Sequence, residues 1–103
     1  MKLYLVTRAD LPPAARAVQL CHALREFTAR FPDEDRQWYE KSNVLVLLEV
    51  ASESALNDLA LQAEACGVAA AAFREPDLAN ATTAVALGPR AKALVRNLPL
   101  ALR

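Results

Sequence analysis

An uninterrupted apolar run in the middle of the chain most constrains its fold. Residues Val44 to Leu48 read Val-Leu-Val-Leu-Leu, without the alternation of polar and apolar residues that marks a strand with one solvated face. Such a run is typical of a strand that is covered on both faces. We therefore expect residues 43–50 to form a strand of a sheet with helices packed on each side.

The segments on either side of this run alternate between strand-like and helix-like patterns. Further strands are predicted at residues 2–8, 68–73 and 82–87, and helices at residues 13–31, 33–41, 53–66 and 90–97, followed by an apolar tail that docks at 98–102. This alternation favours an α/β sandwich with a largely parallel sheet. The short connection between the last two strands favours an antiparallel hairpin at one edge. The length fits one domain, residues 1–103.

The first long helix is expected to carry an apolar face and a polar one. The apolar residues that recur at helical spacing and form the predicted buried stripe are Ala17, Leu20, Cys21, Leu24, Phe27 and Phe31. On the other side, a polar ridge consists of Arg16, Gln19, His22 and Glu26. The ridge starts near the helix N-terminus, where free backbone N–H groups favour an anion. The alternative interpretation is an ordinary solvated face.

A second polar cluster lies in the loop expected at residues 74–81 and at the start of the next strand. Its members are Glu75, Asp77, Asn80, Thr82 and Thr83. If the first and third strands run parallel, the loop with Arg8 and Asp10 opens on the same side as this cluster. That side lies beyond the carboxyl ends of the strands, where ligands favour binding. A carboxylate beside a hydroxyl can position a water and take its proton, as ester hydrolysis requires. The alternative is a polar hairpin turn.

Composition excludes several classes of function. The chain has only two glycines, so no glycine-rich phosphate loop can form. Its two cysteines and one histidine make a poor zinc set, so we expect no metal and a reducing cytoplasm. No stretch approaches the roughly 20 apolar residues of a membrane span, and the first residues look like a strand rather than a secretory signal.

The formal net charge is zero, but the charges are unevenly distributed. Residues 1–31 hold five basic and two acidic side chains, residues 32–64 hold two and eight, and residues 65–103 hold five and two. If the two ends of the chain meet, they form a basic face that attracts an anion such as a nucleic-acid backbone. Otherwise each charge only solvates its own element.

Three stretches resemble the type 2 peptidyl-tRNA hydrolases, in the right order and across nearly the whole chain. They read Leu-Val-Thr-Arg-Ala-Asp-Leu at 5–11, Arg-Ala-Val-Gln-Leu-Cys-His-Ala at 16–23 and Thr-Ala-Val-Ala-Leu-Gly-Pro at 83–89. The resemblance implies a three-layer α/β/α sandwich with a four-stranded mixed sheet, in which the first strand lies beside the fourth. It also implies hydrolysis of the ester bond of peptidyl-tRNA by an activated water, without metal or cofactor, by a homodimer.

The resemblance assigns roles to individual residues. Gln19, His22 and Thr83 match family motifs, and the family's acidic residue falls on Glu75 or Asp77. The family's lysine is replaced by a Pro-Pro-Ala-Ala-Arg stretch that ends at Arg16, a departure that resembles a divergent bacterial branch. The catalytic candidates are Asp77, Glu75, Thr83 and Arg16, and the substrate-binding candidates are Gln19, His22, Arg8, Asp10 and Asn80.

The missing lysine supports a second hypothesis, a catalytically weak or inactive homologue that binds tRNA or a protein. Arginine is a permanent cation that holds phosphate well but cannot shuttle a proton as lysine can. Convergence of Arg16 with Glu75 and Asp77 on one crevice would favour the enzyme. From the small basic set we expect modest, salt-sensitive binding to tRNA.

Overall fold

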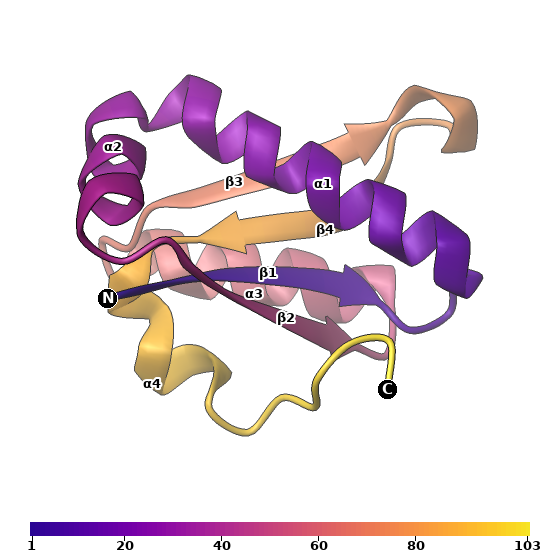
Figure 1. Ribbon diagram of the computed structural model, residues 1–103. Coiled ribbons are helices and arrows are strands. Elements are labelled where there is room, and N and C mark those ends of the chain that lie inside the picture. Colours follow the sequence, from indigo (N-terminus) through magenta and orange to yellow (C-terminus); the bar gives the residue numbers. More distant parts are fainter.

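Four strands and four α-helices follow one another along residues 1–103 of the computed structural model (Figure 1). The elements are β1 Lys2–Arg8, α1 Pro13–Arg30, α2 Pro32–Lys41, β2 Val44–Val50, α3 Glu53–Ala65, β3 Ala70–Glu75, β4 Ala81–Leu87 and α4 Lys92–Val95, with short 3-10 turns at Pro76–Leu78 and Pro89–Ala91. The predicted order of strands and helices is confirmed. None of the helices has the length and apolar character needed to cross a membrane.

The sheet has the strand order β2-β1-β4-β3 and is mixed. β1 pairs with β2 in parallel, whereas β4 lies between β1 and β3 and runs antiparallel to both. The neighbour relation of the first and fourth strands and the hairpin at one edge are therefore confirmed. The expectation of a largely parallel sheet is wrong, because the last strand inserts into the middle of the sheet in the opposite direction.

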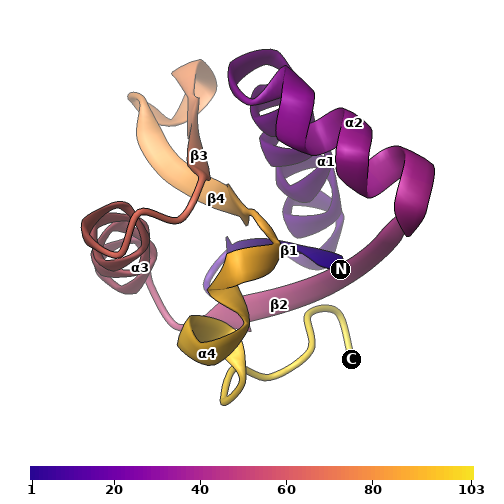
Figure 2. The same cartoon turned by 90° about the vertical axis from the view of Figure 1, so that its left-hand side faces the viewer.

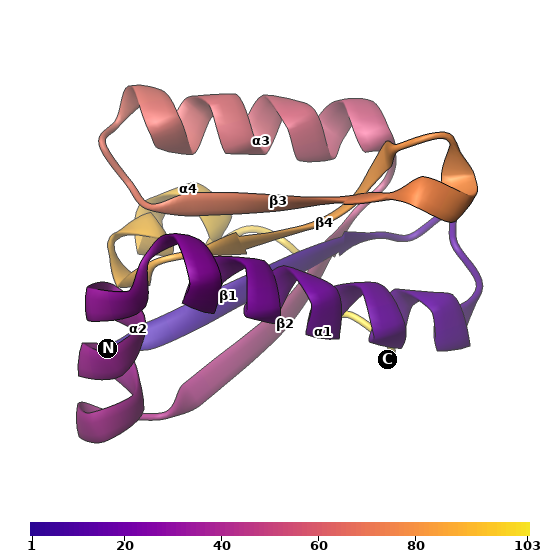
Figure 3. The ribbon, with the colours of Figure 1, turned by 90° about the horizontal axis from the view of Figure 1, so that it is seen from above.

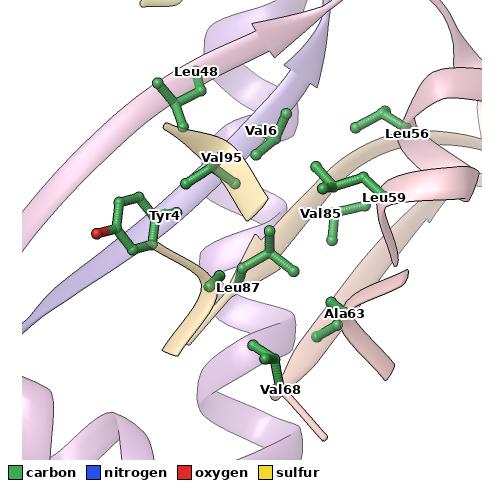
Figure 4. Close-up of a cluster of buried hydrophobic side chains, with 12 residues drawn as sticks. Tyr4, Val6, Leu48, Leu56, Leu59, Ala63, Val68, Val85, Leu87 and Val95 are labelled. Carbon is green, nitrogen blue, oxygen red and sulfur yellow. The ribbon is translucent and has the colours of Figure 1, made fainter. Parts of the chain in front are cut away.

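Helices cover both faces of this sheet and complete a three-layer α/β/α sandwich (Figures 2 and 3). On one face, α1 and α2 bury a cluster that includes Leu5, Phe27 and Trp38. On the other face, α3 and α4 bury a larger cluster, in which Leu56 and Leu59 pack near Val85 of β4 (Figure 4). The two clusters together form the hydrophobic core.

Local sequence signals explain where the helices begin and end. α1 starts with Pro13 in its first turn, where a missing N–H costs nothing, and stops at Phe31 before another proline. The Ser52 hydroxyl caps α3 by accepting a hydrogen bond from the backbone N–H of Ala55, at 3.2 Å. Gly67 follows α3 with φ of 71°, a left-handed conformation that suits glycine.

The central apolar run lies in an edge strand, so the expectation that both of its faces are covered is wrong. Only Leu48 of β2 is buried, whereas Val44 and Leu45 are 44% and 42% exposed. The reason is topological, because α1 packs mainly over β4 and β3 and leaves the far side of β2 uncovered. The C-terminal tail covers only part of that edge, where Leu48 and Leu100 form an antiparallel bridge.

The buried stripe of α1 is turned relative to the predicted one. Cys21 and Ala17 are exposed, so the prediction that Cys21 is an inert core residue is wrong. Gln19 and Ala23 are buried instead. These residues face the sheet because α1 lies over β3 and β4. Part of the polar ridge therefore contacts the two strands and is not fully exposed to solvent.

The third strand begins and ends two residues later than predicted. Arg74 and Glu75 were expected in a loop, but they pair with Thr82 and Ala81 and so extend the hairpin. The last helix is shorter than expected, with a 3-10 turn before α4. As a result, the carboxylate of Glu75 is carried by a strand end and not by a free loop.

Candidate active site

Several polar side chains meet at one end of the sheet. The arrowheads of β1, β2 and β3 point to this end, on the right in Figure 1, and β4 and α1 begin there. This end therefore holds the carboxyl ends of three strands, the start of β4 and the first turns of α1. The expectation that the loops after the first and third strands open on the same side is confirmed.

An irregularity in β4 turns one hydroxyl toward α1. The strand register shifts between Phe73 and Arg74, which pair with Ala84 and Thr82, so that Thr83 is the extra residue of a β-bulge. Strict alternation would place Thr83 on the same face as Val85, under α3. Instead, its hydroxyl reaches Gln19 of α1. Bulges commonly re-aim a side chain in this way.

A short chain of hydrogen bonds links three elements through the amide of Gln19. The Thr83 hydroxyl donates to Gln19 Oε1 at 2.7 Å, and Gln19 Nε2 donates to Glu75 Oε1 at 3.0 Å. Thr83 is fully buried, Gln19 is 5% exposed and Glu75 is half-buried. The chain thus runs outward from the core to a carboxylate at the surface.

Side chains of β1 and α3 hold the backbone of β4 at this bulge. The Thr7 hydroxyl donates to the carbonyl oxygen of Thr83 at 2.8 Å. The backbone N–H of Thr82 donates to Glu53 Oε2 at 2.7 Å, and Arg8 Nη1 donates to the Thr82 carbonyl oxygen at 3.2 Å. These contacts fix the bulge and therefore fix the Thr83 hydroxyl.

Arg16 is held at the same end of the sheet, beside β2. Its Nε donates to the carbonyl oxygen of Leu11 at 2.8 Å, and its Nη1 forms an ion pair with Glu49 Oε2 at 2.9 Å. Both charged side chains are largely shielded from solvent, at 16% and 19% exposure. Arg16 makes no hydrogen bond or ion pair with Glu75 or Asp77, so the structure does not bring these candidates into direct contact.

Arg8 and Asp10 form a bidentate pair in the loop after β1. The Arg8 Nε and Nη2 groups donate to the two carboxylate oxygens of Asp10, each at 2.9 Å. The hydrogen bond from Arg8 lowers the pKa of the Asp10 carboxyl below its ordinary value. The hydrogen bond to Asp10, with the nearby charges of Asp10 and Glu53, raises the pKa of Arg8. Both groups therefore stay charged.

The remaining candidates lie farther out. Asp77 and Asn80 are exposed in the turn between β3 and β4, and neither side chain makes a hydrogen bond within the protein. The Asn80 backbone N–H closes the turn by donating to the carbonyl oxygen of Glu75, at 3.0 Å. His22, also exposed, stacks its ring on Phe73. Of Glu75 and Asp77, only Glu75 thus makes a side-chain contact with another candidate, Gln19.

Sequence reasoning did not identify three residues that hold this site together. Glu49 neutralises Arg16, Glu53 receives the Thr82 N–H, and Thr7 binds the Thr83 backbone. Glu49 had a signal, because it is the single charge within the apolar segment of β2. Glu53 reads only as a favourable acid in the first turn of α3. No group of three or more His, Cys, Asp or Glu side chains is placed to hold a metal ion.

Comparison with known proteins gives one clear result. The family model described as Peptidyl-tRNA hydrolase PTH2 matches residues 1–103, which is the whole chain. None of the curated proteins matches the chain.

The buried hydrogen bond between Thr83 and Gln19 makes a testable contribution to stability. We expect Thr83→Val to lower the free energy of unfolding by about 1–3 kcal/mol, because Gln19 Oε1 is left buried without a donor. In a Gln19→Leu background the same change should cost less than about 0.5 kcal/mol, because no acceptor is then left unsatisfied. Urea titration of the four proteins measures both values. Equal costs in the two backgrounds would contradict the assignment.

Proposed function

The chain belongs to the peptidyl-tRNA hydrolase PTH2 family, and on this basis we propose that it hydrolyses the ester bond between a peptide and the terminal ribose of tRNA. The observation that best supports the proposal is the hydrogen-bonded chain from Thr83 through Gln19 to Glu75. This chain brings a carboxylate and a fixed hydroxyl to the end of the sheet beyond the carboxyl ends of its parallel strands, where ligands of α/β proteins bind.

We propose Glu75 as the group that activates the water. One of its carboxylate oxygens accepts a hydrogen bond from Gln19, which orients the carboxylate and leaves the other oxygen for a water proton. The water oxygen then attacks the ester carbonyl carbon, the bond to the ribose oxygen breaks, and that oxygen takes up the proton that Glu75 received from the water. The products are a free peptide carboxyl group and a ribose hydroxyl. Asp77, two residues away, is the alternative base.

Arg16 is proposed to stabilise negative charge, on the ester oxygen or on a phosphate. Of its five N–H donors, the contacts with Leu11 and Glu49 use two, so others are free to bind an oxyanion. Asp10 and Asn80 are proposed to contact the substrate, and Arg8 to hold Asp10 and the strand start. The reaction as proposed uses no metal or cofactor.

The second candidate function is a homologue that binds tRNA or a protein without turnover. The Arg16–Glu49 ion pair favours it, because Glu49 offsets the charge of the one base that replaces the family's lysine. Both candidates require a tRNA-binding or partner-binding surface, so only an assay of turnover separates them.

A set of basic side chains from both ends of the chain supports tRNA as the partner. Lys2 of β1 and Lys92 and Arg96 near α4 line one surface hollow of about 270 Å³. All three are exposed and none forms an ion pair. This juxtaposition is what the charge distribution along the chain led us to expect, and it offers a small anionic-backbone site.

An apolar groove supports the proposal of a homodimer. The groove, about 220 Å³ in volume, lies between α1 and β2 and is lined by Leu5, Ala17, Leu20, Cys21, Leu24, Leu45, Leu47 and Leu102. It contains no charged residue, which suits a second copy of this chain better than RNA. Val18 of α1, which is exposed, adds apolar surface on the helix that borders the groove, and a two-fold axis would bury the same patch on both subunits.

We propose the cytoplasm as the compartment, in keeping with two free cysteines that are both exposed. Fractionation of cells that express the chain tests this placement, and enrichment outside the cytoplasm would contradict it.

The hydrolase proposal is tested with N-acetyl-aminoacyl-tRNA and the purified protein. We expect Glu75→Gln to reduce kcat by roughly 10²- to 10⁴-fold, because the glutamine oxygen still accepts from Gln19 but cannot take a proton. Asp77→Asn is the matched control and should leave turnover nearly unchanged. A reversed pattern would make Asp77 the base. No turnover by the natural protein, with tRNA binding retained, would favour the binding module.

The basic set near α4 predicts a defined salt dependence of tRNA binding. Three phosphate contacts should give a slope of roughly −2 to −3 in a plot of log affinity against log salt concentration. The double variant Lys92→Gln/Arg96→Gln should flatten this slope by about two, because each base releases about one counterion. Arg36→Gln/Lys41→Gln, on α2, is the matched control. A slope of zero for the natural protein would refute this use of the charges.

The homodimer is tested by sedimentation equilibrium. We expect Leu45→Lys to convert the dimer to a monomer, because it places a charge in the apolar groove. Leu61→Lys on α3 changes an equally apolar residue that is 65% exposed away from the groove, and it should leave the dimer intact. A monomeric natural protein at micromolar concentration, or equal behaviour of the two variants, would contradict the proposed interface.

A further inference from the structure

Two stacked aromatic rings lie beside the hydrogen-bonded chain at the site. The rings of His22 and Phe73 have centroids 4.5 Å apart and an angle of 15° between their planes. Phe73 is half-buried and packs against the cluster under α1. His22 is exposed, so Phe73 leaves part of its ring accessible to solvent.

The stack is adjacent to the proposed reaction site along both elements that build it. His22 follows Gln19 by one turn of α1, a rise of about 5 Å. Phe73 precedes Glu75 by two residues of β3, about 7 Å, and so lies on the same face of the strand. The contacts from Gln19 to Glu75 and from His22 to Phe73 are therefore successive contacts between one helix face and one strand face.

The chemistry of the stack suits an unpaired nucleobase. Histidine and phenylalanine rings are common stacking partners for the bases of single-stranded RNA. One cation lies on the same helix, Arg25, one turn after His22, and it is exposed and takes part in no ion pair.

We propose that the outer face of His22, backed by Phe73, is a stacking platform for the last, unpaired base at the 3′ end of the substrate RNA. This inference rests on the proposed function, since it concerns the same site. In a 3′-acylated nucleotide the ester oxygen is one ribose ring away from the base. A base on His22 therefore brings the ester toward Gln19 and Glu75. Stacking requires no particular base, so the platform positions the RNA end without reading its sequence.

The probe is a dye-labelled ribotrinucleotide, cytidine-cytidine-adenosine, compared with the same molecule lacking its last base. Fluorescence anisotropy gives the two dissociation constants. We expect the natural protein to bind the complete trinucleotide roughly 5- to 100-fold more tightly than the abasic one, the range that one base stack provides. His22→Ala should abolish this difference, and His22→Phe should retain it because a planar ring remains.

Two further variants separate stacking from other effects. His22→Leu keeps an apolar side chain of similar bulk but no flat ring, so it should behave as His22→Ala. Tyr39→Ala removes an aromatic ring that is 65% exposed on α2, away from the stack, and should keep the full difference. Equal binding of both trinucleotides by the natural protein, or a base-dependent difference that persists in His22→Ala and His22→Leu, would overturn the platform.

Binding of the trinucleotides requires no hydrolysis, so the stacking platform and the proposed reaction can be tested independently of each other. Turnover of N-acetyl-aminoacyl-tRNA by a protein that does not distinguish the two trinucleotides overturns the platform alone. Base-dependent binding that requires the ring at position 22, in a protein without turnover, supports the platform and overturns the proposed reaction.

Discussion

The rest of the site depends on a single buried amide. Gln19 lies inside the interface between α1 and the sheet, where an unsatisfied oxygen or nitrogen would cost free energy. Thr83 satisfies its oxygen and Glu75 receives its N–H, so the amide has one orientation and each partner has one position. No buried side-chain polar atom in the molecule lacks a partner. A network satisfied in this way specifies geometry as well as stability.

Charge at the site edge is balanced locally, and free positive charge lies elsewhere. Arg16 is matched by Glu49, and Arg8 by Asp10, within a few residues of the catalytic candidates. The unpaired Lys2, Lys92 and Arg96 line the hollow beside α4. In the proposed function this division assigns two tasks to two places. The unpaired bases attract the RNA backbone, whereas near the reacting ester Arg8 holds Asp10 and the start of β4, and Arg16 offers its remaining N–H donors to an oxyanion.

The elements of the fold could be predicted from periodicity, but their placement could not. Helix stops at Phe31 and Gly67 follow from proline and glycine chemistry. The burial of Gln19, in contrast, depends on which strands α1 crosses, and the position of Leu45 depends on β2 being an edge strand. Resemblance to a family identified Thr83, yet its contact with α1 arises from a bulge that neither strand shows alone. Tertiary pairing decides these points.

The central position of β4 sets the order in which the molecule can be assembled. β4 consists of residues 81–87, close to the end of the chain, and it joins β1, at the very beginning, to β3. During synthesis the first three strands leave the ribosome before the strand that unites them. Until β4 emerges, one edge of β1 is unpaired and the Gln19 amide lacks its hydrogen-bond donor, the Thr83 hydroxyl. The fold therefore closes late, through contacts between distant parts of the chain, which is the arrangement expected to fold slowly and to expose strand edges while it does so.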